Sequence, residues 1–503
     1  MPKYLLGVDF GGSASKATLL RDDGRVVATA VGEYPTYRPS NGWTEQDPKE
    51  QMEAFVGNVH KILSCGVEAD DIVAMAISAA SQTAVYLDKN DRPVRNSIHW
   101  TDGRAGEYVR QIREKFGQKI YQKCHNTPST ARTIAHLSWI RDNEPENFNR
   151  IERIMFVKDY IRYSITGDFV TDYIDAMGSM LMDVPNNCWD EELCGFAGVR
   201  PEQLPRIADP RDFVGDIKQE MLKLTGLSKR TKVIVGSTDT AMEVYANGAI
   251  HQGQMTVKLA TAGRICPITD HELNDPMLIN YKHVVPGLWY PGTGTKSCAA
   301  SYEWYRDVMC VYEQTEAKKA GVKAYDIMNK EAANIAACSD NLFFHPYLQG
   351  ELTPYFDQNL RGSFTGIASF HTKAHFTRAV MEGVAFSLLD CYKVLEKQKL
   401  NIAQTIIIGG GAESALWRQI VCDMLGIEMI KTENADSSLG SAMLAGVASG
   451  IFKDFDDSTE RCVCIQEHIK PNEKNHKLYA EGYKKYRCIH DALETVYGSW
   501  QEQ

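Results

Sequence analysis

Residues 4–30 read Tyr4-Leu5-Leu6-Gly7-Val8-Asp9-Phe10-Gly11-Gly12-Ser13-Ala14-Ser15-Lys16-Ala17-Thr18-Leu19-Leu20-Arg21-Asp22-Asp23-Gly24-Arg25-Val26-Val27-Ala28-Thr29-Ala30. Three apolar runs, at 4–8, 17–20 and 26–30, are separated by a Gly-Gly pair and by Asp-Asp-Gly. Turn-forming residues between short apolar runs are typical of β-hairpins. The stretch therefore predicts three antiparallel strands joined by tight turns. Asp47-Pro48-Lys49-Glu50 then has the residue order of a helix start.

The second half of the chain repeats this pattern. Residues 255–259 are strand-like, Ala260-Thr261-Ala262-Gly263 is a turn of small residues, and residues 265–268 resume the strand pattern. Because each half carries a strand, a turn and a strand, we predict two related domains, 1–250 and 251–503. A chain of 503 residues is also too long for a single hydrophobic core. We predict that the second domain is α/β. Its residues 406–408 form a short apolar strand pattern, which is followed by three glycines and by a helical pattern over 415–425.

The composition is that of an ordinary globular protein, with 44% hydrophobic and 24% charged residues. The net charge of -10 argues against an electrostatic nucleic-acid binder, because such a protein needs a basic face. No apolar run has the roughly 20 residues of a membrane span, and no secretion signal precedes the first strand pattern. The thirteen cysteines include no C-x-x-C pair, which argues against a zinc site and favours a reducing compartment. We expect a cytoplasmic protein that binds neither nucleic acid nor membrane.

The turn after Asp9 has the composition of a phosphate-binding hairpin. A strand that ends in small residues exposes backbone N–H groups toward a polyanion, and glycine allows close approach. Gly11, Gly12 and Ser13 are the candidates for these contacts, and Lys16 adds a positive charge. A carboxylate such as Asp9 beside phosphate implies a divalent cation, so Mg²⁺ is expected. On this segment alone, a plain hairpin turn in which Asp9 makes only local hydrogen bonds is the open alternative.

Two other glycine segments indicate nucleotide binding less well. Gly294-Thr295-Lys296-Ser297 is similar to the end of a Walker A loop, but Thr295 stands where that loop needs a glycine. Gly409-Gly410-Gly411 is similar to a dinucleotide fingerprint, but Ser414 replaces the third glycine. We therefore do not expect an NAD or FAD site.

Asp239 is the candidate catalytic base. It follows the apolar residues 233–235 and Gly236-Ser237-Thr238, and it precedes a helical stretch. A carboxylate at such a junction can accept the proton of a substrate hydroxyl. The alternative is an ordinary N-cap aspartate, unless Ser237 or Thr238 caps the helix and frees Asp239.

A polar cluster suits a ligand with many hydroxyl groups. Ser81-Gln82-Thr83 and Trp100-Thr101-Asp102-Gly103-Arg104 each follow a strand-like run, so both can reach one end of a sheet, where α/β proteins bind ligands. Aromatic faces pack against C–H groups, and polar side chains bind hydroxyls. The candidate substrate contacts are Ser81, Gln82, Trp100 and Asp102. A surface loop with a salt bridge is the alternative.

Together these segments resemble the FGGY family of carbohydrate kinases, in order and over nearly the whole chain. The most specific match is to the family's second signature: Gly362-Ser363-Phe364-Thr365-Gly366-Ile367, a seven-residue spacer and His375-Phe376-Thr377-Arg378-Ala379-Val380-Met381-Glu382. Further stretches are similar to the xylulokinase members of this family. They are residues 43–48, 100–104 and 158–160, Asp172 with Asp175, residues 346–348 with Gly350, Glu351 and Pro354, and residues 409–412 with 417–419.

The resemblance implies an α/β fold of two actin-like (ribonuclease H-like) domains, each a mixed sheet with flanking helices, and an active site in the interdomain cleft. It implies ATP and Mg²⁺ as cofactors and a small sugar as partner. The residue roles that it implies are Asp9 for Mg²⁺, Asp239 as catalytic base and sugar contact, Gly11, Gly12, Ser13 and Lys16 in the first phosphate hairpin, Thr261 and Gly263 in the second, Gly410 and Gly411 in the adenosine-binding turn, and Ser81, Gln82, Trp100 and Asp102 at or near the sugar.

The chain departs from the family pattern near both substrates. The second hairpin, usually Gly-Thr-Ser-Gly, is Ala260-Thr261-Ala262-Gly263 followed by Arg264, and the lysine of the first signature is His136. Ala80-Ser81-Gln82 replaces the Gln-Met-His of xylulokinases. Because Asp9 and Asp239 are kept, we expect an active kinase for a ketopentose-like sugar, with D-xylulose first and another ketose, a polyol or a sugar acid as alternatives. A non-catalytic sugar-binding relative is a further alternative, and a homodimer is left open.

Overall fold

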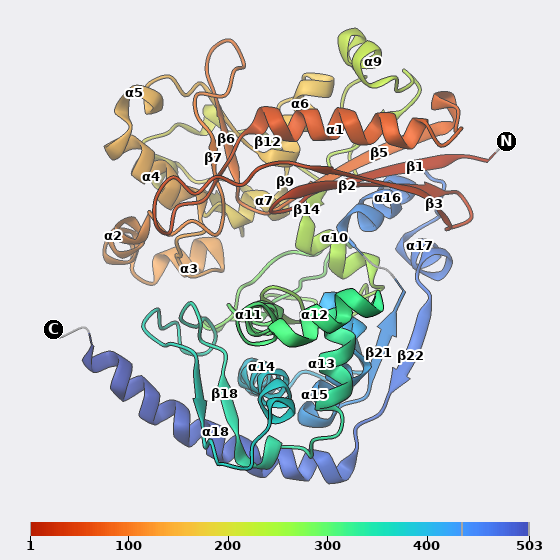
Figure 1. Ribbon diagram of the computed structural model, residues 1–503. Helices are drawn as coiled ribbons and strands as arrows, with labels where there is room; N and C mark the ends of the chain where they lie inside the picture. Colours follow the sequence, from red (N-terminus) through yellow and green to blue (C-terminus); the bar gives the residue numbers. More distant parts are fainter. Residues whose placement is uncertain (1, 434–435, 501–503) are drawn as a thin grey trace. The chain divides into compact units, whose positions relative to one another are not determined.

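Residues 2–433 and 436–500 are described by the computed structural model, which divides the chain into two units (Figure 1). Unit 1 consists of Met1–Ile250, Asp270–Trp289 and Asn434–Cys464, and unit 2 of His251–Thr269, Tyr290–Glu433 and Ile465–Gln503. The chain thus first changes unit between Ile250 and His251. Two later segments then return to unit 1, which the division into 1–250 and 251–503 did not include.

The central sheet of unit 1 has the order β13-β5-β1-β2-β3, and β14 also pairs with β5. Its strands are β1 (Tyr4–Phe10), β2 (Ala14–Arg21), β3 (Val26–Glu33), β5 (Ile72–Ala79), β13 (Lys232–Val233) and β14 (Ser237–Thr238). The prediction of three antiparallel N-terminal strands is confirmed, and β5 runs parallel to β1. This pairing places Asp9 in register with Lys16 on one side and with Ser78 on the other.

Helices cover both faces of this sheet (Figure 1). On one face, α1 (Pro48–Leu63) begins as predicted, because the Asp47 carboxylate accepts a hydrogen bond from the Lys49 N–H at 2.9 Å. Its buried face, which includes Phe55 and Val59, belongs to the core of the sheet. On the other face lie α10 (Asp239–Ala246) and α16 (Ser437–Ala448).

The rest of unit 1 includes a second hydrophobic core, to which Tyr86, Ile134 and Ile154 belong. Its short strands are β4 (Glu45–Gln46), β6 (Ala84–Leu87), β7 (Ser97–Ile98), β8 (Arg153–Phe156), β9 (Val170–Asp172), β10 (Met182–Asp183), β11 (Cys188–Trp189) and β12 (Arg206–Ala208). Its helices are α2 (Gly106–Phe116), α3 (Lys119–Cys124), α4 (Thr133–Asn143), α5 (Pro145–Phe148), α6 (Val157–Thr166), α7 (Tyr173–Gly178), α8 (Glu191–Ala197), α9 (Gln219–Thr225) and α17 (Phe455–Cys462), with 3-10 turns at Ala69–Asp71 and Pro201–Gln203.

Unit 2 has a mixed sheet of its own, in the order β17-β16-β15-β20-β21-β22. Its strands are β15 (Gln254–Leu259), β16 (Gly263–Pro267), β17 (Thr293–Thr295), β20 (Gln404–Ile408), β21 (Met429–Thr432) and β22 (Ile465–Ile469). The antiparallel pair β15–β16 is the predicted counterpart of β1–β2, and β20 runs parallel to β15. The predicted internal repeat is therefore confirmed.

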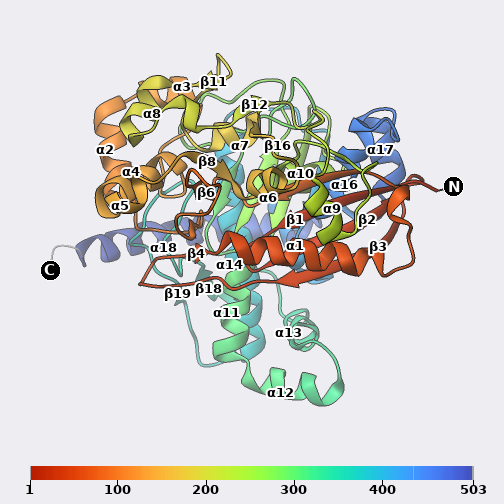
Figure 2. The same ribbon diagram turned by 90° about the horizontal axis from the view of Figure 1, so that it is seen from above.

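The helices of unit 2 are α11 (Ala299–Met309), α12 (Val311–Ala320), α13 (Ala324–Ala332), α14 (Lys373–Glu396), α15 (Ala415–Leu425) and α18 (Glu473–Ser499). A two-stranded ribbon, β18 (Phe343–His345) with β19 (Ser363–Thr365), and 3-10 turns at Ser339–Asn341 and Gly410–Glu413 complete the unit. Figure 2 shows α12 and α13 at the tip of a projection that begins with α11. The long terminal helix predicted over residues 475–496 is confirmed as α18. Within the described part of the chain, no helix is long and apolar enough to span a membrane.

Gly7 controls how closely α16 can approach β1. A Cβ atom at Gly7 would lie 1.9 Å from the Ser438 carbonyl oxygen and 2.4 Å from the Ala442 nitrogen, both of which are backbone atoms of α16. We predict that Gly7→Ala lowers the free energy of unfolding by about 3 kcal/mol or more, because backbone atoms cannot move aside as a flexible side chain can. Urea unfolding monitored by circular dichroism measures this change.

Gly57→Ala is the matched control for this prediction. Gly57 lies in α1, and a Cβ atom there would meet no atom within 4 Å. Alanine should stabilise this helix by about 0.5–1 kcal/mol. Equal unfolding midpoints for Gly7→Ala and the wild type would contradict the close packing of α16 on β1.

Candidate active site

Asp9 lies at the end of β1 among other acidic side chains. The Ser78 hydroxyl, from the neighbouring strand β5, donates a hydrogen bond to Asp9 Oδ1 at 2.6 Å. Burial of the carboxyl group and the nearby charges of Asp239, Asp436 and Glu243 raise the pKa of Asp9 well above its ordinary value. Unit 1 therefore holds at this point a carboxylate that a cation or another positive group would stabilise.

The turn after Asp9 has the arrangement of a phosphate cradle. The Tyr34 hydroxyl donates to the Gly11 carbonyl at 2.5 Å, and Gln46 Nε2 and the Thr36 hydroxyl donate to the Gly12 carbonyl. The backbone N–H groups of Gly12 and Ser13 donate to no residue in the described part of the chain. Backbone N–H groups that have no protein acceptor in such a turn are able to donate to an anion. This arrangement favours the phosphate hypothesis over a plain hairpin turn.

Lys16 lies on β2 opposite Asp9, and its amino group forms an ion pair with Asp436. Asp436 is the N-cap of α16, where its Oδ1 accepts from the Ser438 and Leu439 N–H groups at 2.9 and 3.1 Å. Burial alone would raise the pKa of Asp436, but the charge of Lys16 and these hydrogen bonds lower it below its ordinary value. The sequence analysis did not select Asp436. The sequence indicates its capping role, because an aspartate before a helical stretch is a typical N-cap. Nothing in the sequence indicates that it pairs with Lys16.

Asp239 is the first residue of α10, but it does not cap the helix. The N-cap is Thr238, whose hydroxyl accepts from the Ala241 N–H at 3.4 Å. Gly236 before it has φ of +74°, and a Cβ atom there would lie 2.1 Å from the Ile77 carbonyl oxygen, so the turn requires glycine. Asp239 Oδ1 accepts from the Thr240 N–H at 2.7 Å and from the Ser81 hydroxyl at 3.5 Å. The structure thus brings Ser81 to the candidate base.

Gln82, next to Ser81, is buried and has φ of +66°. Its backbone N–H donates to Asp175 Oδ1 at 2.9 Å, and its side-chain amide contacts the Tyr281 hydroxyl. Tyr281 lies in the segment Asp270–Trp289 that returns to unit 1. The sequence analysis did not include this segment in the sugar site, because nothing in its local pattern shows which unit it joins.

Asp102 and Trp100 lie in a different environment. Asp102 is fully buried, and its two oxygens accept from Arg104 Nε and Nη2 at 2.9 and 2.8 Å. The Thr44 N–H donates to the same carboxylate at 2.5 Å, and the Arg104 guanidinium lies 3.8 Å from the centre of the Trp43 ring. The Trp100 side chain is exposed. These contacts match the salt-bridge alternative for Asp102, and among the described residues neither Asp102 nor Trp100 forms a hydrogen bond with Ser81 or Gln82.

A buried ionic cluster supports both the base and the sugar candidates. Lys158 Nζ lies 2.7 Å from Asp159, 2.8 Å from Asp172 and 3.4 Å from Asp175, and all four side chains are at most 1% exposed. Asp172 accepts from the Ser237 hydroxyl at 2.9 Å, two residues before Asp239, while Asp175 binds the backbone of Gln82. The cluster therefore connects the two chain segments that carry Asp239 and Ser81. The sequence analysis noted Asp172 and Asp175 only as family-like positions.

The nucleotide candidates of unit 2 lie at one edge of its sheet. Lys258 of β15 pairs with Ile408 of β20, so the turns that follow these parallel strands are neighbours. The turn after β15 is fixed because the Ala260 and Thr261 carbonyls accept from the Ala299 and Cys298 N–H groups at 2.7 and 3.0 Å. The structure thus brings Thr261 and Gly263 to the same edge as Gly410 and Gly411.

Glycine is required at several points of these two turns. A Cβ atom at Gly263 would lie 2.7 Å from Thr295 Cγ2, and one at Gly411 would lie 2.9 Å from Leu259 Cβ. At Gly410 it would meet no atom within 4 Å. Gly410 is exposed, so its backbone is open to a ligand.

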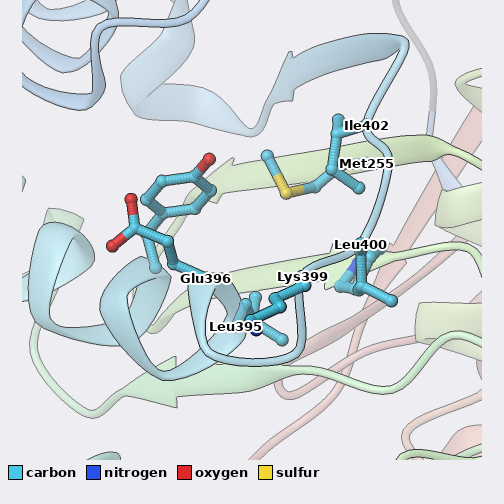
Figure 3. Close-up of a pocket in the computed structure, with 8 residues that line it drawn as sticks. Met255, Leu395, Glu396, Lys399, Leu400 and Ile402 are labelled. Atoms are coloured by element: carbon cyan, nitrogen blue, oxygen red, sulfur yellow. The ribbon is translucent and has the colours of Figure 1, made fainter.

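A cavity of about 240 Å³ in unit 2 is unrelated to these residues (Figure 3). Met255 and Ile402, two of its lining residues, lie near the starts of β15 and β20, whereas the candidate turns follow the ends of these strands. Its remaining lining residues are Pro267, Tyr392, Leu395, Glu396, Lys399 and Leu400. None of the predicted site residues lines this cavity.

Comparisons with known proteins agree with this architecture. Residues 4–245 match the N-terminal domain, and residues 258–449 the C-terminal domain, of the FGGY family of carbohydrate kinases. A xylulose kinase of Lactococcus lactis subsp. lactis (strain IL1403) is 30% identical over 98% of this chain and 97% of its own. Solved structures of a ligand-bound xylulose kinase and of a gluconate kinase, both from Lactobacillus acidophilus, give TM-scores of 0.91 and 0.90, each at 28% identity and covering 99% of this chain and 100% of the other. This chain therefore belongs to the FGGY family of carbohydrate kinases.

Proposed function

We propose that the protein transfers the γ-phosphate of ATP to a hydroxyl of a small sugar, and that Asp239 accepts the proton of that hydroxyl. The observation that carries this proposal is the position of Asp239 at the start of α10. Thr238 caps the helix in its place, and the Ser81 hydroxyl donates to its carboxylate. The base is thus kept at the site without serving as the helix cap. Family membership supplies the reaction class, phosphoryl transfer to an alcohol.

Residues of both units are proposed to bind ATP. In unit 1, the N–H groups after Gly11 and the Lys16 ammonium bind phosphate oxygens, and Lys16 exchanges Asp436 for phosphate when the nucleotide arrives. In unit 2, Thr261 and Gly263 bind phosphate, and the exposed backbone of Gly410 and Gly411 contacts the adenosine. Phosphoryl transfer depends mainly on positioning and charge neutralisation, which backbone donors and a lysine provide.

Asp9 is proposed to hold Mg²⁺ that arrives with the nucleotide. Within the described residues, no group of three or more His, Cys, Asp or Glu side chains could hold a metal ion. This fits Mg²⁺, which usually keeps water and substrate phosphate ligands and needs only one or two carboxylates. Burial and the charges of three neighbouring carboxylates raise the pKa of Asp9, so a cation beside it would stabilise its ionised form. When bound, Mg²⁺ neutralises charge on the phosphate oxygens.

Ser81 and Gln82 are proposed to position the acceptor sugar beside Asp239. Asp102, with both oxygens bound to Arg104 and Thr44, is proposed to fix the loop that carries Trp100. D-xylulose is the first acceptor candidate, because xylulose kinases are among the relatives. A sugar acid is the second, because gluconate kinases of similar overlap are also among them. We place the protein in the cytoplasm, for which its thirteen cysteines are the support.

Asp239→Asn should lower kcat for sugar phosphorylation by about 10²- to 10⁴-fold, because an amide cannot accept the hydroxyl proton. The KM for ATP should change little, since Asp239 is not proposed to bind the nucleotide. ADP release with and without sugar measures both quantities. Asp142→Asn is the matched control, because Asp142 is partly exposed at the end of α4 and pairs with its neighbour Arg141. Unchanged sugar-dependent turnover by Asp239→Asn would overturn the assignment of the base.

Asp9→Asn should raise the Mg²⁺ concentration needed for half-maximal turnover by about 10- to 100-fold, because an amide attracts the cation and its bound water less strongly. Chelation by EDTA should stop turnover by the wild type, and added Mg²⁺ should restore it. Asp22→Asn, in the turn at the far end of β2, is the control. An unchanged Mg²⁺ dependence in Asp9→Asn would remove Asp9 from the metal site.

A further inference from the structure

Arg132 is a buried cation in the sugar-binding half of unit 1. It immediately precedes α4, and it is 4% exposed. Its Nη1 donates to the Tyr281 hydroxyl at 2.9 Å and to the Gly178 carbonyl at 3.2 Å. With Gln82 Nε2 donating to the Ala131 carbonyl at 3.0 Å, Gln82 Oε1 also lies 3.2 Å from Nη1. Every hydrogen bond that the Arg132 guanidinium makes with described residues is therefore made through Nη1, and its Cζ also lies 5.9 Å from the centre of the Tyr281 ring.

Within the described residues, the opposite edge of this guanidinium makes no hydrogen bond. Nε is buried and donates to no described atom, and the hydrogen bonds of the side chain all use Nη1 rather than Nη2. Two other arginines of the chain use this edge to bind a carboxylate. Nε and Nη2 of Arg104 bind the two oxygens of Asp102 at 2.9 and 2.8 Å, and those of Arg211 bind Asp209 at 2.9 and 3.0 Å. The edge that Arg132 leaves unused is the one that matches a carboxylate in two parallel hydrogen bonds.

Arg132 also has no ion-pair partner among the described residues. Its hydrogen-bond acceptors, the Tyr281 hydroxyl and the Gly178 carbonyl, are neutral, although a buried arginine keeps its positive charge. Burying a charged group is costly unless it is paired. A cation without a counter-ion is therefore expected where a bound ligand supplies the negative charge.

Arg132 is connected to the acceptor site through Gln82. The Gln82 side chain contacts both Tyr281 and Arg132, and the adjacent Ser81 binds Asp239. The Gln82 amide is thereby used to hold Tyr281 and Arg132. This is the segment in which the chain departs from the xylulokinase pattern, so the contacts that it makes bear directly on the choice of sugar.

We propose that Arg132 is a specificity-determining residue that binds a carboxylate of the acceptor, so that the substrate is a sugar acid. The inference rests on the proposed kinase function and narrows its acceptor from the two candidate classes to one. The carboxylate accepts from Nε and Nη2 of Arg132, while Tyr281 and Gln82 fix the guanidinium through Nη1. Asp239 acts at a hydroxyl elsewhere on the same acceptor. A neutral ketose would leave the Nε–Nη2 edge without a charged partner.

The test uses acceptor pairs that differ in a single terminal group. D-gluconate is compared with D-glucitol, and D-xylonate with xylitol, and D-xylulose is measured beside them. ADP release by the full chain gives kcat/KM for each acceptor. We expect kcat/KM for each acid to exceed that for its matched polyol by at least about tenfold, and kcat/KM for the better acid to exceed that for D-xylulose. The reason is that only the acids can form charge-assisted hydrogen bonds with the Arg132 guanidinium.

Arg132→Gln should reduce the acid-to-polyol ratio by at least about tenfold while the KM for ATP stays near the wild-type value. Arg132→Lys keeps the positive charge but cannot form two parallel hydrogen bonds with a carboxylate. Its acid-to-polyol ratio should lie between those of the wild type and Arg132→Gln. A purely structural role would lower turnover of acid and polyol alike. Arg110→Gln, on the exposed face of α2, is the control and should leave the ratio unchanged. Circular dichroism and melting confirm that each variant is folded.

Calorimetric measurement of D-gluconate binding tests the carboxylate site independently of the proposed kinase activity. Binding by the wild type that Arg132→Gln weakens at least about tenfold supports the carboxylate site, even if no acceptor is phosphorylated and the kinase proposal fails. Preference for the neutral member of both pairs overturns the inference and leaves the kinase proposal standing. An acid-to-polyol ratio unchanged by Arg132→Gln also overturns it, as does the absence of any D-gluconate binding.

Discussion

The site of unit 1 depends on the close contact between α16 and β1. Gly7 lets the backbone of the helix reach the strand, since any side chain there would overlap the Ser438 carbonyl. The N-terminus of α16 consequently lies beside the end of β1, where Asp436 pairs with Lys16 and the Ser437 hydroxyl donates to the Asp239 carbonyl at 2.9 Å. A segment more than 400 residues from Gly7 in the chain thus completes the environment of Asp9. The charged groups around Asp9 therefore depend on the packing of α16 against β1.

Electrostatics explains why this environment suits a polyanion and its cation. Burial and the charges of Asp239, Asp436 and Glu243 disfavour the ionised form of Asp9. Lys16 is the cation paired within this group, and its partner is Asp436. The site is therefore arranged so that an arriving cation stabilises Asp9, while phosphate competes with Asp436 for Lys16. The buried cluster of Lys158 with Asp172 and Asp175 fixes the neighbouring chain, because Asp172 accepts from the Ser237 hydroxyl and Asp175 from the Gln82 N–H.

Local features were predicted from the sequence and distant ones were not. The start of α1 at Asp47 and Pro48, the span of α15 and the two strand-turn-strand repeats are encoded by adjacent residues, so a single sequence shows them. Asp436 and Tyr281 join the site because later segments return to unit 1, and no local period indicates which core such a segment packs against. The sequence also does not show that Nε and Nη2 of Arg132 lack a hydrogen-bond partner, because this depends on which residues the fold places beside them. The sequence did show that Ala80-Ser81-Gln82 departs from the xylulokinase pattern, and the structure shows that Gln82 contacts Tyr281 and Arg132.

The central claim is that this chain transfers a phosphoryl group from ATP to a sugar hydroxyl. The most direct measurement follows the phosphoryl group itself, by incubating the protein with Mg²⁺, ATP labelled with ¹⁸O in the γ-phosphate and the panel of sugars and sugar acids. Mass spectrometry then identifies which product carries the labelled phosphate. The account predicts labelled phosphate on an acceptor. Labelled phosphate found solely as inorganic phosphate, at a rate that no acceptor changes, would contradict it.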